Sequence, residues 1–239
     1  MIYEERIYRS LINKDNLISY NVKINESDLL ISSDVNLADL AEKSLIKHRH
    51  SLEAYIKNHP EFRTTLLPFP EDNLAPLIIR EMIAQSKNCG VGPMASVAGA
   101  ISEYVGHDLL YKTENIIIEN GGDIFLQSKK NLTVAIYAGE SALSYKVKII
   151  VKADETPIGI CTSSATVGPS LSFGKADAVC ILSKSATLAD AAASAVGNKV
   201  KSKKDIKTAL NYGIKIPGVK GIVIICGSEM GVIGEVEFI

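Results

Sequence analysis

An aspartate and a serine four residues apart are the strongest chemical signal in this sequence. Asp190 and Ser194 lie in an alanine-rich segment that we expect to form a helix starting near Thr187, so both side chains project from one helical face. A carboxylate and a hydroxyl suit Mg²⁺ when backbone carbonyls, water and substrate phosphates complete the shell. A structural explanation stays open, because the helix dipole favours an aspartate in a first turn by about 0.3–1 kcal/mol. We take the pair as candidate metal-binding and catalytic residues.

Two short polar motifs provide candidate ligand contacts. The run Thr162–Ser164 offers hydroxyls and backbone amides at the end of an expected strand, which suits a phosphate or a ribityl chain. The glycines of Gly121-Gly122-Asp123 would let a ligand approach the backbone, and Asp123 offers a hydrogen-bond acceptor. Each motif also has a plainer interpretation, as a polar strand end and as a tight turn between strands.

A glycine-rich run precedes another expected helix. Pro93 follows Gly90 and Gly92 and is well placed in the first turn of that helix, whose exposed amides could hold an anion. Close packing on a sheet explains the small residues equally well. Cys89 and Cys161 each begin one of these motifs, whereas Cys180 and Cys226 lie inside apolar strands and are expected in the core.

The order of the expected elements indicates a duplicated α+β arrangement. Strands, helices and strands follow one another twice, which predicts a largely antiparallel sheet with helices on one face. We expect a single domain, 1–239, built of two packed halves, about 1–140 and 141–239. Asp34 is expected to cap the first helix, and His48 and His50 are expected to be solvated. Strands are expected at 3–11, 17–24, 29–32, 115–120, 124–128, 132–138, 145–152, 157–161, 176–183, 219–226 and 232–239, and helices at 36–58, 74–87, 188–200 and 203–212, with another from 93.

Composition excludes several classes of protein. A net charge of −1 with 22% charged residues argues against a general nucleic-acid binder. No apolar stretch approaches the roughly 20 residues of a membrane-spanning helix, and the start of the chain lacks the pattern of a secretory signal. The four cysteines are far apart and form no CxxC pair, which argues against a zinc knuckle. We expect a cytoplasmic protein that binds a small molecule, and a homo-oligomer is compatible with the sequence.

Three motifs together resemble those of ApbE-type flavin transferases. In that family they look like an N-x-GGD turn, a TSG strand end and an ADAxATA helix. The whole chain is most similar to an uncharacterised branch of the superfamily, marked by the runs CGVGPMASVAGAISEYVG and GICTSS…GPSLSFGKADAV. The matching residues of this chain are Asn120, Gly121, Gly122 and Asp123, then Thr162, Ser163 and Ser164, and then the helix with Asp190 and Ser194.

The resemblance implies a T-fold-like α+β structure with a flavin or other nucleotide-like ligand, such as FAD, near the GGD turn. It implies a divalent metal, usually Mg²⁺, held by Asp190 and Ser194. The transferases also carry a His-x-x-Asp-Pro-x-x-Gly segment between the TSG strand end and the helix. This chain has neither the histidine nor the Asp-Pro pair there, in Gly168–Ala178, and its helix hydroxyl is serine rather than threonine.

Three functions therefore stay open at the level of sequence. The first is a metal-dependent FMN transferase or another enzyme that processes FAD. The second is a flavin- or nucleotide-binding protein without catalytic activity. The third, suggested by the branch of the superfamily, is an enzyme of anaerobic sulfur metabolism, in homocysteine biosynthesis, that uses Cys89 or Cys161.

Overall fold

An eight-stranded antiparallel sheet forms the centre of the protein. The structure is a computed structural model and describes residues 17–165 and 173–239. The strand expected at 3–11 and much of the segment 168–178 lie outside the described residues. The strands follow the spatial order β1-β2-β3-β4-β7-β8-β9-β10, so chain order and sheet order agree except where β5 and β6 leave the sheet. Their bounds are Ile18–Ile24, Ser27–Ser33, Ile116–Asn120, Asp123–Gln127, Ile158–Ser163, Ala178–Ser183, Val219–Cys226 and Glu229–Gly234.

The main sheet consists of two similar groups of strands joined at one pairing. In each group two strands are followed by helices and then by two further strands, first β1 to β4 and then β7 to β10. The groups meet where β4 pairs with β7, with Asp123 opposite Cys161. This order of elements is the one expected from the sequence, in an α+β protein with a largely antiparallel sheet.

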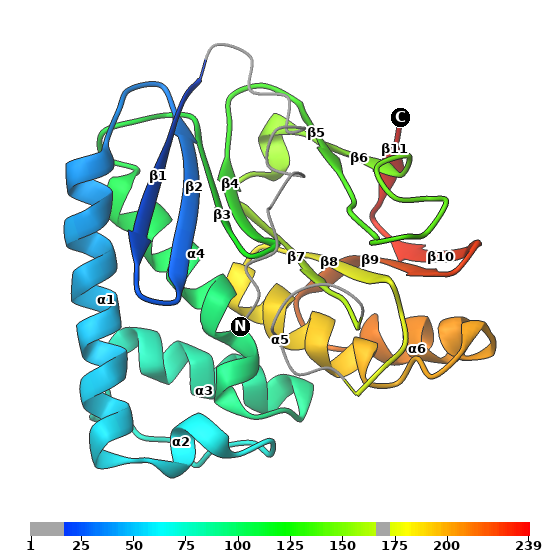
Figure 1. Ribbon diagram of the computed structural model, residues 1–239, viewed down its shortest axis with the longest axis horizontal. Helices are drawn as coiled ribbons and strands as arrows, with labels where there is room; N and C mark the ends of the chain where they lie inside the picture. The colour runs from blue at the N-terminus through cyan, green and yellow to red at the C-terminus, as the bar shows by residue number, and fades with distance from the viewer. Residues whose placement is uncertain (1–16, 166–172) are drawn as a thin grey trace.

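Helices cover one face of this sheet and a smaller sheet covers the other (Figure 1). The main helices are α1 (Ala38–Asn58), α3 (Leu77–Cys89), α4 (Val97–Leu109), α5 (Ala186–Gly197) and α6 (Ile206–Gly213), with the short α2 (Glu61–Thr64) beside them. Side chains alternate across each strand, so Ile118, Phe125 and Val179 join the helical core. In the part of the chain that the structure describes, no helix is long and apolar enough to span a membrane.

The strand expected at 132–138 lies in the smaller sheet rather than in the main one. Instead of extending the main sheet beside β4, strand β5 (Leu132–Ala135) pairs with β6 (Lys148–Val151), which in turn pairs with β11 (Glu237–Phe238). The expected strand 232–239 is therefore two strands, β10 and β11, in different sheets. The physical reason is a second apolar face: Ile117, Ile124 and Ile160 project away from the helices and need cover of their own.

Two local expectations are also wrong. Asp34 does not cap α1; its carboxylate accepts hydrogen bonds from Thr113 Oγ1 and from the amides of Glu114 and Asn115, which ties the end of β2 to the start of β3. His48 is buried rather than solvated, because it packs on Tyr104 and its Nε2 lies 2.9 Å from Asp108.

Candidate functional site

The carboxylate of Asp190, a residue of α5, lies at the N-terminal end of α4. Helix α5 begins at Ala186, capped by Ser185, so Asp190 sits beyond the first turn in which the sequence placed it. Its Oδ2 accepts the amide hydrogen of Gly99 at 2.9 Å, and the amide of Ala98 also donates to this carboxylate. The amides at the start of α4 therefore do hold an anion, which is a side chain of the protein itself in the position that the helix dipole favours.

The close approach of α4 and α5 depends on Gly99. A Cβ added there would lie 2.2 Å from the carbonyl oxygen of Ala186 and 2.8 Å from Asp190 Cβ. Such contacts are too short for any side chain, so glycine is required at this point. The small residues of both helices therefore bring the amides of one helix to the carboxylate of the other.

Asp123 is a second carboxylate at the same place. It begins β4 directly after the glycine turn, is 8% exposed, and alternates with Phe125, so it points to the helical face of the sheet. It pairs in register with Cys161 of β7, and the two side chains are hydrogen bonded. The negative charge of Asp190 acts directly on Asp123, so the structure brings together two acidic residues that are 67 positions apart in the chain.

The electrostatics of this carboxylate pair are unusual. Burial raises the pKa of Asp123 well above its ordinary value, and the nearby charge of Asp190 raises it further. Burial also raises the pKa of Asp190 to about 7, although the amides of Gly99 and Ala98 act in the opposite direction. Among the described residues, the structure records no salt bridge from a Lys, Arg or His to either carboxylate. A proton or a bound cation is therefore needed to compensate their charge near neutral pH.

The turn between β3 and β4 is held from both sides. Gly121 and Gly122 both have positive φ, 69° and 104°, which glycine adopts without strain. The amide of Gly122 donates to Glu119 Oε1 at 2.7 Å, and its carbonyl accepts from the amide of Thr162 at 3.2 Å. Asn120 donates through Nδ2 to the carbonyl of Ala98 at the start of α4. The turn thus joins the sheet to the helix start that binds Asp190.

The hydroxyl cluster is divided between the two faces of the sheet. Ser163 shares the helical face with Cys161 and lies against the last turn of α5, since a Cβ on Gly197 would be 3.7 Å from Ser163 Oγ. Thr162 projects to the other face, where it is hydrogen bonded to Cys180. Ser164 follows the end of β7. The sequence could not separate these neighbours without knowing which face of the strand the helices cover.

Ser194 continues the stripe of α5 that faces the sheet. Asp190, Ser194 and Gly197 follow the i, i+4, i+7 spacing of one helical face, and both ends of this stripe contact the site, at Gly99 and at Ser163. The Ser194 side chain is partly exposed. The structure therefore places its hydroxyl on the same helix face as Asp190.

The burial of the four cysteines differs from the expectation at one position. Cys89, Cys161 and Cys180 are buried, whereas Cys226 is only partly buried at the end of β9, so its expected core position is wrong. Burial raises the pKa of Cys89 to about 12 and that of Cys161 well above its ordinary value, and Asp190 adds to both shifts. Both thiols near the carboxylates are therefore protonated and unreactive.

The chemistry of the donor set fits a hard cation. Asp123 and Asp190 supply carboxylate oxygens, and Ser194 offers a neutral hydroxyl on the same face of α5 as Asp190. Among the described residues, no group of three or more His, Cys, Asp and Glu side chains is arranged to hold a metal. A cation here would therefore need further oxygens from water or from a ligand.

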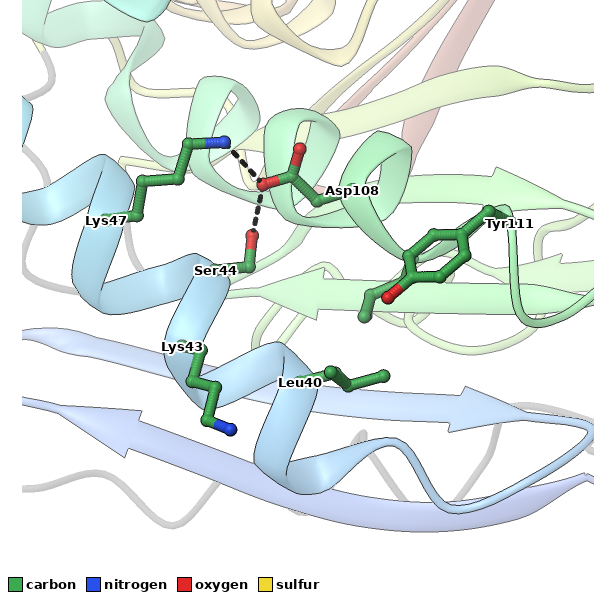
Figure 2. Close-up of a pocket in the computed structure, with 7 residues that line it drawn as sticks. Leu40, Lys43, Ser44, Lys47, Asp108 and Tyr111 are labelled. Carbon is green, nitrogen blue, oxygen red and sulfur yellow. Dashed lines mark hydrogen bonds and ion pairs between the residues drawn. The ribbon is translucent and has the colours of Figure 1, made fainter.

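A surface cavity of about 230 Å³ lies elsewhere, between α1 and the end of α4 (Figure 2). Asp108 is one of the residues that line it, and its Oδ2 accepts from Ser44 Oγ at 2.9 Å and from Lys47 Nζ at 3.1 Å. His48 lies 2.9 Å from the same oxygen. One oxygen of this carboxylate thus joins two helices, so we assign the cavity a structural origin. No sequence motif indicated this cavity.

The chain belongs to a family of ApbE-like proteins. The family model described as "AbpE bacteria" matches residues 9–237. Among similar curated proteins, the UPF0280 protein of Methanococcus vannielii is 40% identical over 226 residues and covers 92% of each chain. The UPF0280 protein of Methanocaldococcus jannaschii is 39% identical over 219 residues, with 89% of each chain covered. The family membership expected from the motifs is thereby confirmed.

Solved structures of flavin transferases share the fold. The apo form of the flavinyl transferase ApbE from Pseudomonas stutzeri matches with a TM-score of 0.56 over 91% of this chain and 94% of that one, at 13% identity. A variant of the flavin transferase ApbE from Vibrio cholerae gives a TM-score of 0.59 at 12% identity, with 92% and 97% covered. At these identities the likeness establishes the α+β fold alone.

Proposed function

We propose that this protein binds a flavin dinucleotide such as FAD together with Mg²⁺ and acts on its phosphates. The observation that carries the proposal is the pair Asp123 and Asp190, two carboxylates with raised pKa values beside a glycine turn. A divalent cation would compensate both charges, and the phosphates of a dinucleotide would complete its oxygen shell. The flavin transferases that share the fold support flavin as the ligand.

Within this proposal, each half of the chain has its own task. Asp123 and Asp190 hold the cation, with Ser194 as a neutral ligand, and the bound cation would supply charge stabilisation to the phosphates. Gly121 and Gly122 carry no side chain that would obstruct the phosphates, and Asn120, Ser163 and Ser164 lie at the turn and the strand end. Cleavage of FAD would break the bond between the FMN phosphorus and the bridging oxygen of the pyrophosphate, and this oxygen would leave with AMP. A hydroxyl oxygen from water or an acceptor would form the new bond to the FMN phosphorus and lose its proton.

Binding without turnover is a second candidate. It is favoured by the sequence between β7 and β8, which lacks the histidine and the Asp-Pro pair of the transferases. The sulfur-chemistry alternative is disfavoured, because Cys89 and Cys161 are buried thiols with raised pKa values.

Calorimetric titration tests the proposal. Mg²⁺ affinity should be weak for the protein alone and should rise when FAD is present, because two ligands of one site couple reciprocally. Chromatography of the same mixtures for FMN and AMP separates the two candidates, since only an enzyme releases them. Equal Mg²⁺ affinity with and without FAD would contradict the shared site.

A further inference from the structure

Glu103 of α4 makes an unusual set of contacts with the start of α5. It is 8% exposed, and its Oε2 accepts hydrogen bonds from three donors of the neighbouring helix. These donors are Ser185 Oγ at 3.0 Å, the amide of Thr187 at 2.8 Å and Thr187 Oγ1 at 2.7 Å. Burial raises the pKa of Glu103, but hydrogen bonds from His107, Thr187 and Ser185 outweigh it, so the pKa lies below its ordinary value. Glu103 is therefore a charged anchor for the first turn of α5.

This contact is the counterpart of the one made by Asp190. Asp190 of α5 accepts an amide from the first turn of α4, and Glu103 of α4 accepts an amide from the first turn of α5. Gly99 and Glu103 are four residues apart, so the two contacts lie about 6 Å apart along α4. Two separated contacts fix both the rotation and the translation of one helix against the other, which a single contact cannot do.

We infer that Glu103 is the positioning residue of the carboxylate pair. Its hydrogen bonds hold α5 in the rotation that directs Asp190 toward Asp123, and it touches neither ligand nor cation itself. This inference rests on the proposed function, because Asp190 is taken as a ligand of the cation. It assigns to α4 a role in positioning the site, whereas the three motifs shared with the flavin transferases lie in the turn, the strand end and α5.

The variant Glu103→Gln tests the inference, because it keeps the shape and removes the charge that three donors share. Mn²⁺ replaces Mg²⁺ as a probe whose free and bound forms are distinguished by electron paramagnetic resonance. We expect Mn²⁺ to bind about tenfold more weakly, the lower end of the effect of losing a supporting contact around a metal. Hydrogen exchange at the Gly99 amide should also become faster without any metal, because Asp190 no longer holds it firmly.

Asp108→Asn is the matched control, since Asp108 also joins α4 to another helix. It should lower the melting temperature but leave both Mn²⁺ affinity and Gly99 exchange unchanged. If Glu103→Gln does not fold, Thr187→Val removes one of the three donors and should give smaller changes of the same kind. Unchanged Gly99 exchange and Mn²⁺ affinity in the folded variant would overturn the inference alone. A wild-type protein that binds no Mn²⁺ would overturn the proposed site and the inference with it.

Discussion

The two ends of helix α4 each carry a buried or half-buried acidic cluster, and the two clusters are electrostatic opposites. At the start of the helix, the charge of Asp190 acts on Asp123, and burial raises both pKa values. Near its end, about 13 Å away along the helix, Asp108 accepts hydrogen bonds from Ser44 and Lys47. Burial would raise the pKa of Asp108 too, but hydrogen bonds from Ser44, Lys47 and His48 outweigh it and lower the pKa.

The difference separates a structural carboxylate from one that is available for chemistry. Asp108 opposes the helix dipole at a C-terminus, and the protein compensates it with donors of its own. Asp190 has a favourable helix start but shares its site with a second acid, and the two compete for one compensating charge. A cation would bind most favourably at the uncompensated pair, Asp123 and Asp190. The cavity drawn in Figure 2 lies instead at Asp108.

The largest expected effect is on metal affinity. Asp190→Asn should weaken Mn²⁺ binding by at least about 100-fold, the upper end of what substitutions around a metal cost. An asparagine oxygen still accepts the Gly99 amide, so the fold should persist. Asp108→Asn should bind Mn²⁺ as the wild type does. Equal losses in both variants, measured by calorimetry, would remove the distinction between the two clusters.

A smaller effect concerns the pH dependence of stability, which should have opposite signs at the two clusters. Because the folded pKa of Asp190 is raised to about 7, the folded state holds a proton that the unfolded state releases from about pH 4 upward. Without metal, this group therefore lowers the free energy of unfolding as pH rises to 7, by at most about 1.4 kcal/mol per pH unit. Asp108 has a lowered pKa, so its ionised carboxylate stabilises the folded state above about pH 4, and this stabilisation is lost as the pH falls further.

Denaturant titrations of the wild type and both variants measure these contributions by difference, so other groups such as His48 cancel. Asp190→Asn should remove the decline in the free energy of unfolding between about pH 4 and 7. Asp108→Asn should remove the part of the loss of stability below about pH 4 that Asp108 causes. Saturating Mg²⁺ should flatten the wild-type decline, because the cation replaces the proton. A wild type and Asp190→Asn variant with parallel pH profiles would show that Asp190 is not protonated at neutral pH.

The smallest effect distinguishes the thiols near the site from the thiol outside it. Cys226 is partly exposed, whereas Cys89 and Cys161 are buried beside Asp190. A small alkylating agent at pH 8 should therefore label Cys226 first in the native protein, as peptide mass spectrometry would show. Preferential labelling of Cys161 or Cys89 would instead restore sulfur chemistry as a candidate.

Local sequence patterns predicted most of the elements, because helical and strand periodicities are properties of short segments. The start of α1 was placed within two residues, at 36 instead of Ala38. The alanine-rich helix was expected near Thr187 and begins at Ala186, but Asp190 lies beyond its first turn. Its partners, Gly99 and Asp123, are distant in the chain, and no periodicity reports such contacts.

The remaining errors have the same cause. Whether β5 pairs with β4 or with β6 depends on which faces of the main sheet are still uncovered, which is a property of the whole fold. The separation of Thr162 from Ser163 needs the same knowledge. Glu103 lies in the run that marks the branch of the superfamily, but nothing in its own neighbourhood distinguished it, because a glutamate on a helix is ordinarily a solvated residue.

The β4–β7 pairing has a consequence for how the site forms. Asp123 belongs to the first group of strands and Asp190 to the second, so neither half of the chain holds both acids. Separate polypeptides of residues 1–140 and 141–239 would each fail to bind a divalent cation. Cation binding would return only when the two polypeptides reassociate. The ion would then bind only to the reassembled pair of fragments, and its binding would stabilise their association.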